Sequence, residues 1–184
     1  MESDIADILI GEEEIQAKVR QLGRDISRDY ANLNPLLVGV LKGIVVFMAD
    51  LLRAITVPVS VDFMAISSYG TEAASRGSVR IIKDLDADIH GQHVLIVEDV
   101  IDTGLTLSYI LKNLQAREPA SLKVCTLFNR PQQRLLEIPI AYKGFDLPDC
   151  FVVGYGLDYE ERYRNLPFVG VLKEEILGTG RLYA

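Results

Sequence analysis

Residues 94–107 read VLIVEDVIDTGLTL and place three acids behind a run of apolar side chains. The spacing predicts a buried strand over residues 93–98, after which Asp99 and Asp102 lead through Thr-Gly into a helix that starts near Gly104. Neighbouring carboxylates repel one another, and burying them costs free energy unless a cation or a proton compensates. The stretch therefore indicates a site that receives positive charge from a ligand.

The turn Asp102-Thr103-Gly104 also predicts a phosphate site. A helix N-terminus offers free N–H groups and a partial positive charge, Thr103 and Thr106 add hydroxyl donors, and Gly104 lets the backbone approach closely. Acids on one side and amides on the other fit a sugar phosphate, with the diol on the acids and the phosphate on the amides. The alternative is that Asp102 or Thr103 only caps the helix and that the acids are solvated. The pattern alone leaves both interpretations open.

The whole chain has the composition of an ordinary globular protein. Its 184 residues are enough for one domain, 1–184, and 49% apolar with 24% charged residues exclude wholesale disorder. The net charge of −7 argues against nucleic acid or an anionic membrane as a partner, because both require a basic face. Local basic sites for a small phosphate ligand are compatible with this charge.

The cysteines and the N-terminus predict a cytoplasmic protein. Cys125 and Cys150 lie far apart in apolar contexts without metal-ligand spacing, as is typical of reduced, buried thiols. Residues 1–14 are acidic and lack the basic and apolar regions of a secretory signal. No apolar run approaches the ~18 residues that a membrane crossing requires. We therefore expect a soluble protein in the cytoplasm.

Apolar periodicity alternates between strand and helix along the chain. Helical spacing predicts helices over residues 11–30, 44–55 and 104–114, and residues 71–79 are small and polar like a mobile loop. Strand patterns cover residues 36–40, 59–70, 79–85, 93–98, 121–128, 138–145 and 150–156. This order is typical of an α/β domain with a mainly parallel central sheet, in which ligands bind beyond the carboxyl ends of the strands.

Several segments resemble one enzyme family. Residues 94–107 resemble the motif with which type I phosphoribosyltransferases bind 5-phosphoribosyl diphosphate (PRPP). The chain from about residue 5 to 173 resembles the bacterial hypoxanthine-guanine phosphoribosyltransferases, through GVLKG (39–43), DFMAISSYG (62–70) and PDCFVVGYGLDYEERYRNLPFVGVL (148–172). The resemblance implies the type I phosphoribosyltransferase fold, in which helices flank a mainly parallel central sheet and a small hood covers the active site.

The resemblance also implies a reaction in purine salvage. Such an enzyme transfers the 5-phosphoribosyl group of PRPP to N9 of hypoxanthine or guanine, giving IMP or GMP and pyrophosphate. Mg²⁺ is the implied cofactor, and the family's habit, together with the apolar 44–55 helix, predicts a homodimer or homotetramer. The implied partners are small molecules, with no nucleic acid and no membrane.

Site residues follow from the same resemblance. Asp102 matches the general base beside purine N7, and Glu98 and Asp99 match the acids that hold the ribose hydroxyls, partly through Mg²⁺. The residues that match the ribose and 5′-phosphate site are Glu98, Asp99, Asp102, Thr103, Gly104, Leu105 and Thr106. The residues that match the pyrophosphate site are Leu41, Lys42, Gly43 and Arg164, with a cis peptide between the first two.

The remaining matches concern the lid and the purine. Ser68 and Tyr69 match the start of a lid that closes over PRPP and excludes water. The residues that match the purine site are Ile101, Arg130, Phe151, Val152 and Asp158, and Asp158 also matches a magnesium-side acid. Periodicity alone assigns Phe151 and Val152 to the core and makes Lys42 and Arg164 solvated cations.

Two positions depart from the family pattern. Arg130, preceded by Asn129, stands where the family usually has a lysine that donates to the purine 6-oxo group. Arginine is longer and planar, so the base preference is open and xanthine remains an alternative. Cys150 occupies a position that often holds lysine or glutamate, and we expect little consequence because neighbouring backbone reads the purine there.

Other classes of function are less compatible with the sequence. A PRPP-binding regulator that has lost catalysis would not need Asp102, Lys42 and Arg164 together. A transferase for adenine or a pyrimidine is a second alternative, which only a test with several bases separates. Neither G-x-G-x-x-G nor G-x-x-x-x-G-K-[ST] occurs, which disfavours a dinucleotide-binding enzyme and a P-loop NTPase.

Overall fold

A six-stranded sheet forms the centre of the molecule. The computed structural model describes residues 1–68 and 79–178, so Tyr69 and nearly all of the predicted loop 71–79 lie outside the described residues. The strand order is β4-β3-β2-β5-β6-β7, and every neighbouring pair is parallel except β3 and β4. The strands are β2 (Leu36–Leu41), β3 (Ser60–Ser68), β4 (Val79–Lys83), β5 (His93–Ile101), β6 (Ser121–Asn129) and β7 (Tyr142–Asp146). This arrangement confirms the predicted α/β class.

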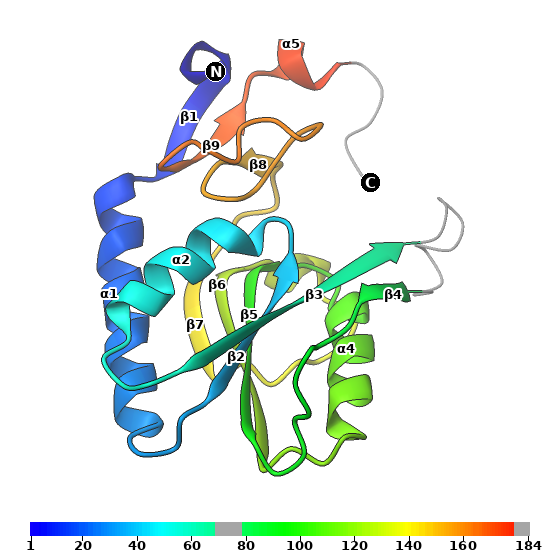
Figure 1. The fold of residues 1–184 in the computed structure, drawn as a ribbon. Coiled ribbons are helices and arrows are strands. Elements are labelled where there is room, and N and C mark those ends of the chain that lie inside the picture. The colour runs from blue at the N-terminus through cyan, green and yellow to red at the C-terminus, as the bar shows by residue number, and fades with distance from the viewer. Residues whose placement is uncertain (69–78, 179–184) are drawn as a thin grey trace.

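Helices cover both faces of this sheet (Figure 1). Helices α1 (Glu12–Asp29) and α2 (Ile44–Ala54) lie on one face, and α4 (Leu105–Gln115) lies on the other. Each helix buries one apolar stripe, which in α1 consists of Ile15, Val19, Leu22 and Ile26. Because both faces are covered, β2 and the first half of β5 are apolar almost without interruption rather than alternating.

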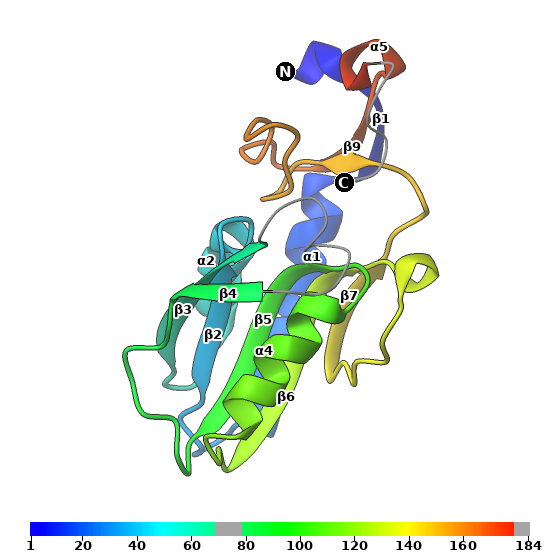
Figure 2. The ribbon, with the colours of Figure 1, turned by 90° about the vertical axis from the view of Figure 1, so that its right-hand side faces the viewer.

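A separate three-stranded antiparallel sheet forms the hood. Its order is β1-β9-β8, with β1 (Ile5–Ile10), β8 (Val152–Val153) and β9 (Val169–Leu172). The hood lies beyond the carboxyl ends of β2, β5 and β6, as Figures 1 and 2 show. It brings together both ends of the described chain, because the Tyr163 hydroxyl donates to Asp4 Oδ2 at 3.0 Å and the Lys173 N–H donates to the Asp4 carbonyl at 2.9 Å. Short helices η1 (Glu2–Asp4) and α5 (Glu174–Leu177) adjoin it.

Several predicted boundaries were wrong. Strand β5 continues to Ile101 instead of ending at Glu98, because Glu98 and Ile101 still pair with Thr126 and Asn129 of β6. Residues 138–141 are not a strand, and β7 begins at Tyr142. The predicted strand over residues 150–156 shrinks to β8, since Gly154 turns the chain at φ +100°. Strands β1 and β9 were not predicted at all.

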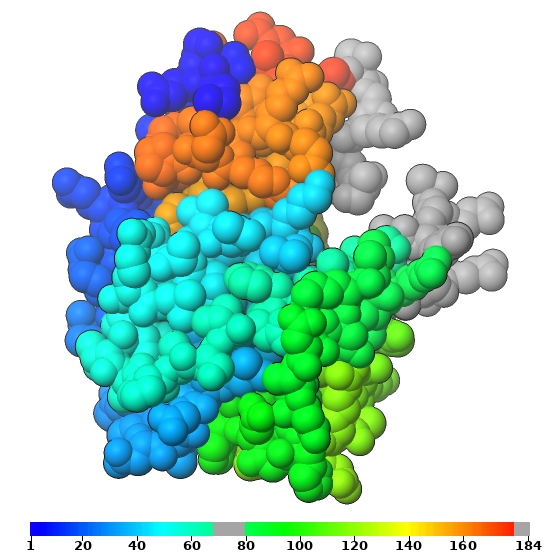
Figure 3. Space-filling model, viewed as in Figure 1, coloured from blue at the N-terminus to red at the C-terminus, as the bar shows by residue number. Residues whose placement is uncertain are grey.

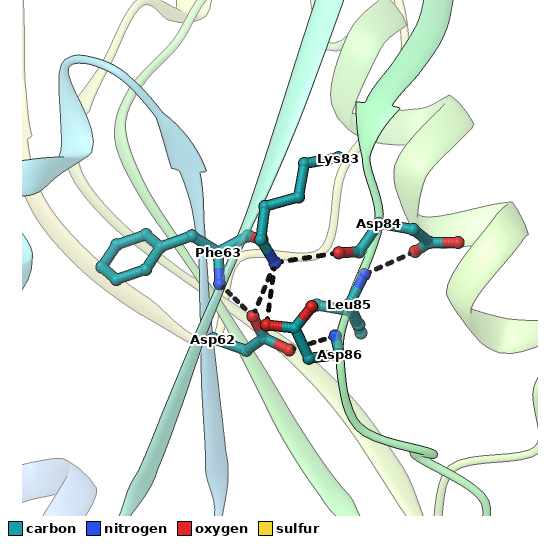
Figure 4. A network of polar contacts seen from close by, with 6 residues as sticks. All are labelled: Asp62, Phe63, Lys83, Asp84, Leu85 and Asp86. Carbon is teal, nitrogen blue, oxygen red and sulfur yellow. Dashed lines mark hydrogen bonds and ion pairs between the residues drawn. The ribbon is translucent and has the colours of Figure 1, made fainter.

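The β3–β4 pair is fixed at its base by a buried acid (Figure 4). Asp62 Oδ1 accepts hydrogen bonds from the Phe63 N–H at 2.7 Å and from Lys83 Nζ at 3.2 Å, while Oδ2 accepts from the Asp86 N–H at 2.7 Å. Burial alone would raise the pKa of Asp62, but these hydrogen bonds bring it below its ordinary value. The carboxylate is therefore a satisfied structural group, unlike the acids of β5.

The two cysteines are free thiols, as the sequence predicts. Cys125 is buried in β6, and Cys150 is half-buried before β8. Burial raises the pKa of the Cys125 thiol, which keeps it protonated. Burial also raises the pKa of the Cys150 thiol, so neither thiol is activated as a thiolate. No helix within residues 1–68 and 79–178 is both long and apolar enough to cross a bilayer.

Candidate active site

The three acids lie at the carboxyl edge of the central sheet, beneath the hood. Glu98 and Asp99 belong to the second half of β5, and Asp102 follows directly after the strand. The geometry of a strand points consecutive side chains to opposite faces, so the three carboxylates come from one short segment but start in different directions. We call residues 98–106, which run from the second half of β5 into the start of α4, the strand end. Because ligands of such sheets bind beyond the carboxyl ends of the strands, the strand end is the candidate site at this edge.

The first two acids are held in an environment that disfavours their charge. Burial raises the pKa of Asp99 to about 6, against the effect of a hydrogen bond from the Val100 N–H at 2.8 Å and of the Arg164 charge. Burial, together with the neighbouring Asp99 charge, raises the pKa of Glu98 well above its ordinary value. Two adjacent, poorly compensated carboxylates of this kind favour a proton or a bound cation.

Carboxylate oxygens of this pair fit Mg²⁺. Among the described residues, no group of three His, Cys, Asp or Glu side chains is arranged to hold a metal ion. The Asp158 carboxylate instead contacts Arg164 Nη2 at 2.8 Å and accepts from the Glu161 N–H at 2.9 Å. Mg²⁺ is usually held by one or two carboxylates plus substrate phosphates, so two acids are compatible with such a site, and a ligand role for Glu98 and Asp99 stays a prediction. A ligand role for Asp158 stays a prediction.

The loop after the acids is braced from a neighbouring segment. Gly104 has φ +80°, and a Cβ there would lie 2.9 Å from the carbonyl oxygen of Leu136. The N–H groups of Leu135 and Leu136 donate to the Thr103 carbonyl at 3.0 and 3.2 Å. Within the loop, the Leu105 N–H donates to Thr103 Oγ1 at 3.3 Å. The N-terminal amides of α4 are thus presented by a loop of fixed shape.

Asp102 does not cap this helix. The residue at the N-cap is Gly104, the Leu105 N–H donates to Thr103 Oγ1 rather than to Asp102, and Asp102 Oδ1 is a buried atom without a hydrogen-bond partner. The Asp102 side chain is 44% exposed and lies 3.4 Å from Arg130 Nε. Burial raises the pKa of Asp102 and the charges of Arg130 and Arg134 lower it, with a net rise. A partly exposed carboxylate with a raised pKa can accept a proton from a ligand.

Two arginines stand beside Asp102. The Arg130 guanidinium donates through Nη2 to the Cys150 carbonyl at 3.1 Å, which links the segment after β6 to the start of the hood. Arg134 donates through Nη2 to the Ile101 carbonyl at 3.3 Å and to Asn129 Oδ1. The sequence patterns did not identify Arg134, because it follows the short helix η2 (Pro131–Gln133), where no periodicity marks a site.

The segment after β2 meets both the acids and the hood. The peptide between Leu41 and Lys42 is cis, as the resemblance implied. A Cβ at Gly43 would overlap the Asp99 carboxylate, and a Cβ at Gly156 would overlap the Gly43 carbonyl. In the space-filling view, the orange hood segment lies against the cyan start of α2 (Figure 3). The hood loop is residues 154–168, which connect β8 to β9. The two glycines therefore allow the hood loop and the β2–α2 segment to touch at the strand end.

Cations from both segments face this junction. Arg164 donates through Nη1 to the Gly156 carbonyl at 2.8 Å and lies 3.3 Å from a Glu161 carboxylate oxygen through Nη2. Lys42 Nζ lies 3.0 Å from the other oxygen of Glu161. Glu161 was not identified from the sequence, where it stands in a stretch of mixed charges. The structure thus brings Lys42 and Arg164 to one carboxylate, although they lie far apart in the chain.

The predicted purine residues belong partly to the strand end and partly to the hood. Ile101 is buried at the end of β5, and Val152 is buried in β8. Phe151 is half-buried and packs edge-on against Tyr159, with ring centroids 5.6 Å apart. Ser68 ends β3, and Tyr69 lies outside the described residues. Val152 is thus buried, as its assignment to the core predicts. A contact between these residues and a purine base stays a prediction.

Comparison with known proteins points to one family. The pattern described as a phosphoribosyl transferase domain matches residues 10–160. A hypoxanthine-guanine phosphoribosyltransferase of Mycobacterium tuberculosis is 53% identical over 179 residues, covering 94% of this chain and 89% of its own. That of Bacillus subtilis is 51% identical over 176 residues, covering 96% and 98%. A hypoxanthine phosphoribosyltransferase structure from Staphylococcus aureus superposes with a TM-score of 0.93 at 45% identity, covering 97% of each chain.

Proposed function

This chain belongs to the hypoxanthine-guanine phosphoribosyltransferases of the phosphoribosyl transferase family, and from this premise we propose how its own residues carry the reaction. The enzyme transfers the 5-phosphoribosyl group of PRPP to N9 of hypoxanthine or guanine, with IMP or GMP and pyrophosphate as products. The observation that carries the proposal is the Asp102 carboxylate at the carboxyl end of β5, whose side chain is partly exposed and whose pKa is raised by burial.

Asp102 is the proton acceptor in this proposal. As the purine N9 lone pair forms its bond to C1′ of the ribose, the bond from C1′ to the pyrophosphate oxygen breaks, and the proton on N7 passes to an Asp102 carboxylate oxygen. The raised pKa of Asp102 increases its proton affinity, while its partial exposure keeps it accessible to the base. Asp102 then loses this proton to solvent before the next turnover.

Charge on the leaving group is stabilised from two segments. Lys42 and Arg164 donate to the departing pyrophosphate, and the α4 amides with Thr103 and Thr106 hold the 5′-phosphate. Glu98 and Asp99 bind the ribose hydroxyls and present carboxylates to Mg²⁺. When bound, Mg²⁺ neutralises pyrophosphate charge and helps to orient the substrate. Asp158 serves as a second acid on the magnesium side of the purine site.

The purine site lies between Ile101 and the hood. Phe151 and Val152 provide the apolar wall, and Arg130 donates to the 6-oxo group in place of the family's lysine. The Arg130 guanidinium donates to the Cys150 carbonyl and stands beside Asp102, so this side chain links the proposed proton acceptor to the start of the hood. Its planar fork favours oxo groups over the amino group of adenine.

Location and assembly follow the same premise. The whole chain acts as one catalytic domain in the cytoplasm, with Ser68 and Tyr69 at the start of a lid. We expect a homodimer or homotetramer. Light scattering at micromolar concentration should give a mass of two or four times 20.5 kDa, and a mass of 20.5 kDa alone would contradict this expectation.

A panel of bases tests the proposed reaction. Purified protein with PRPP and Mg²⁺ is incubated with hypoxanthine, guanine, xanthine, adenine or uracil, and nucleotide and pyrophosphate are quantified together. We expect IMP and GMP, each equimolar with pyrophosphate, and no product in excess chelator. Absence of nucleotide with every base, or full activity in chelator, would contradict the proposal. The xanthine reaction reports how the Arg130 guanidinium changes base preference.

A further inference from the structure

One acid of the hood binds both cations of the proposed pyrophosphate site. Glu161 Oε1 lies 3.0 Å from Lys42 Nζ, and Glu161 Oε2 lies 3.3 Å from Arg164 Nη2. A carboxylate that bridges two cations with separate oxygens has the arrangement that an anionic phosphate group would take between them. Glu161 therefore already supplies the negative charge that the two cations are expected to receive from a substrate.

The loop geometry holds the Glu161 backbone in place, while the side chain is exposed. The Glu161 backbone has φ +62°, and its N–H donates to Asp158 Oδ2 at 2.9 Å, so the main chain is positioned independently of the side chain. The side chains of Lys42 and Glu161 remain 69% and 62% exposed. Ion pairs this exposed contribute little free energy and are readily replaced by a ligand of higher charge.

We propose that Glu161 is an internal competitor of pyrophosphate, which pairs with Lys42 and Arg164 when the site is empty and is displaced when PRPP or pyrophosphate binds. The inference rests on the proposed function, because it takes these two cations to be pyrophosphate ligands. Its consequence is kinetic as well as thermodynamic. A carboxylate that returns to the cations lowers the affinity for the pyrophosphate product and speeds its release. Lys42 then regains Glu161 as its counter-ion, whereas Arg164 also pairs with Asp158 at 2.8 Å.

Charge and hydrogen bonding give the expected size of the effect. The hydrogen bonds from Lys42 and Arg164 lower the pKa of Glu161, so the carboxylate is ionised near neutral pH. Displacing it requires breaking the exposed pair with Lys42 and the pair with the half-buried Arg164, and the measured range for surface ion pairs corresponds to about a 2–10-fold loss of affinity for the competing anion. The penalty should shrink as salt screens the exposed charges.

The test compares two neighbouring glutamates. Glu161→Gln removes the charge but keeps the side-chain size and the backbone hydrogen bond to Asp158. Glu160→Gln removes the same charge one residue away, where Glu160 pairs only with Arg162 at 3.7 Å among the described residues. Titration calorimetry with magnesium pyrophosphate should give about 2–10-fold tighter binding for Glu161→Gln and wild-type affinity for Glu160→Gln. The KM for PRPP should fall by a similar factor, while that for hypoxanthine stays unchanged.

Each outcome has one meaning. Weaker or unchanged binding in Glu161→Gln overturns the inference, because a residue that organises Lys42 and Arg164 would lose affinity when neutralised. Equal tightening in both variants also overturns it, since the effect would then be long-range charge. If wild-type protein forms IMP and Lys42→Ala weakens pyrophosphate binding while Glu161→Gln changes nothing, the inference alone fails. If wild-type protein neither forms nucleotide nor binds pyrophosphate, the proposed function fails with it.

Discussion

The pKa values of acids at the strand end and of acids in the hood are shifted in opposite directions. At the strand end, burial raises the pKa values of Glu98, Asp99 and Asp102. In the hood, a hydrogen bond from the Tyr163 hydroxyl lowers the pKa of Asp4, and hydrogen bonds from Lys42 and Arg164 lower that of Glu161. Groups of the protein thus stabilise the negative charges of Asp4 and Glu161, whereas the negative charges of the strand-end acids depend on a ligand for stabilisation.

The two regions also differ in how the chain builds them. The strand end is one continuous segment that follows a parallel strand, so its chemistry is local in sequence. The hood is assembled from both ends of the described chain, as the contact between Asp4 and Tyr163 shows. We infer a division of roles in which the strand end handles the proton and the ribose phosphate, and the hood loop with Lys42 handles the pyrophosphate.

The largest predicted effect concerns the proton acceptor of the strand end. Asp102→Asn should lower the rate of the chemical step by about 10²–10⁴-fold, the usual contribution of a positioned acid or base. The fold should change little, because Asp102 forms no cap and the substitution loses only the 3.4 Å ion pair with Arg130 Nε. Single-turnover formation of IMP measures this step directly. The control is Asp149→Asn, which changes an exposed acid bonded to Gln133 and should keep the wild-type rate. Near-normal turnover in Asp102→Asn would remove this residue from the mechanism.

The next prediction concerns the junction between the two regions. Gly156→Ala should lower the free energy of unfolding by about 3 kcal/mol, because φ is +99° and the new Cβ would overlap the Gly43 carbonyl. Gly91→Ala is the matched control, since Gly91 has φ +67° but a Cβ added there would meet nothing within 4 Å, and it should lose only about 1–2 kcal/mol. Urea unfolding measures the loss of unfolding free energy in each variant. The difference between the two losses gives the cost of the overlap between the new Cβ and the Gly43 carbonyl. Equal losses would show that the hood loop does not depend on this contact.

The third prediction uses the raised pKa values. Since the pKa of Asp99 rises from 3.8 to about 6 on folding, its stabilising contribution is complete below about pH 4 and is lost as the pH rises through about 6. Asp99→Asn should therefore match the wild type near pH 4 and exceed its free energy of unfolding by about 1–3 kcal/mol near pH 7. Denaturant titrations at several pH values measure the difference. An offset between the two proteins that does not change with pH would contradict the assigned burial of this charge.

The smallest predicted effect concerns the closure of the hood. Tyr163→Phe removes the hydroxyl that donates to Asp4 and should cost about 0.5–1.5 kcal/mol. Tyr109→Phe on α4, where the side chain is 39% exposed, should cost less. Amide hydrogen exchange should accelerate in β1 and β9 of the Tyr163 variant and stay unchanged in β5. Equal acceleration in both regions would mean that the hood and the strand end open as one unit.

The difference between the regions also explains which parts of the structure the sequence could predict. The acids of residues 94–107 and the start of α4 were predictable, since a buried strand, a glycine and a helical stripe are local signals. Strand β1, IADILI, was missed because its pairing with β9 contains two register shifts and has no regular alternation. Arg134 and Glu161 act through contacts between distant segments, which no local spacing reveals.

The pyrophosphate affinity of Arg164→Gln compared with that of Asp102→Asn tests the division of roles most directly. Arg164 contacts Gly156, Asp158 and Glu161 in the hood loop, so its loss should weaken magnesium pyrophosphate binding by about 10–100-fold, the range for hydrogen bonds between charged groups. Asp102→Asn should bind pyrophosphate within about twofold of the wild type, because in the proposed reaction Asp102 acts on the purine. Similar losses in both variants, or a loss only in Asp102→Asn, would contradict the account.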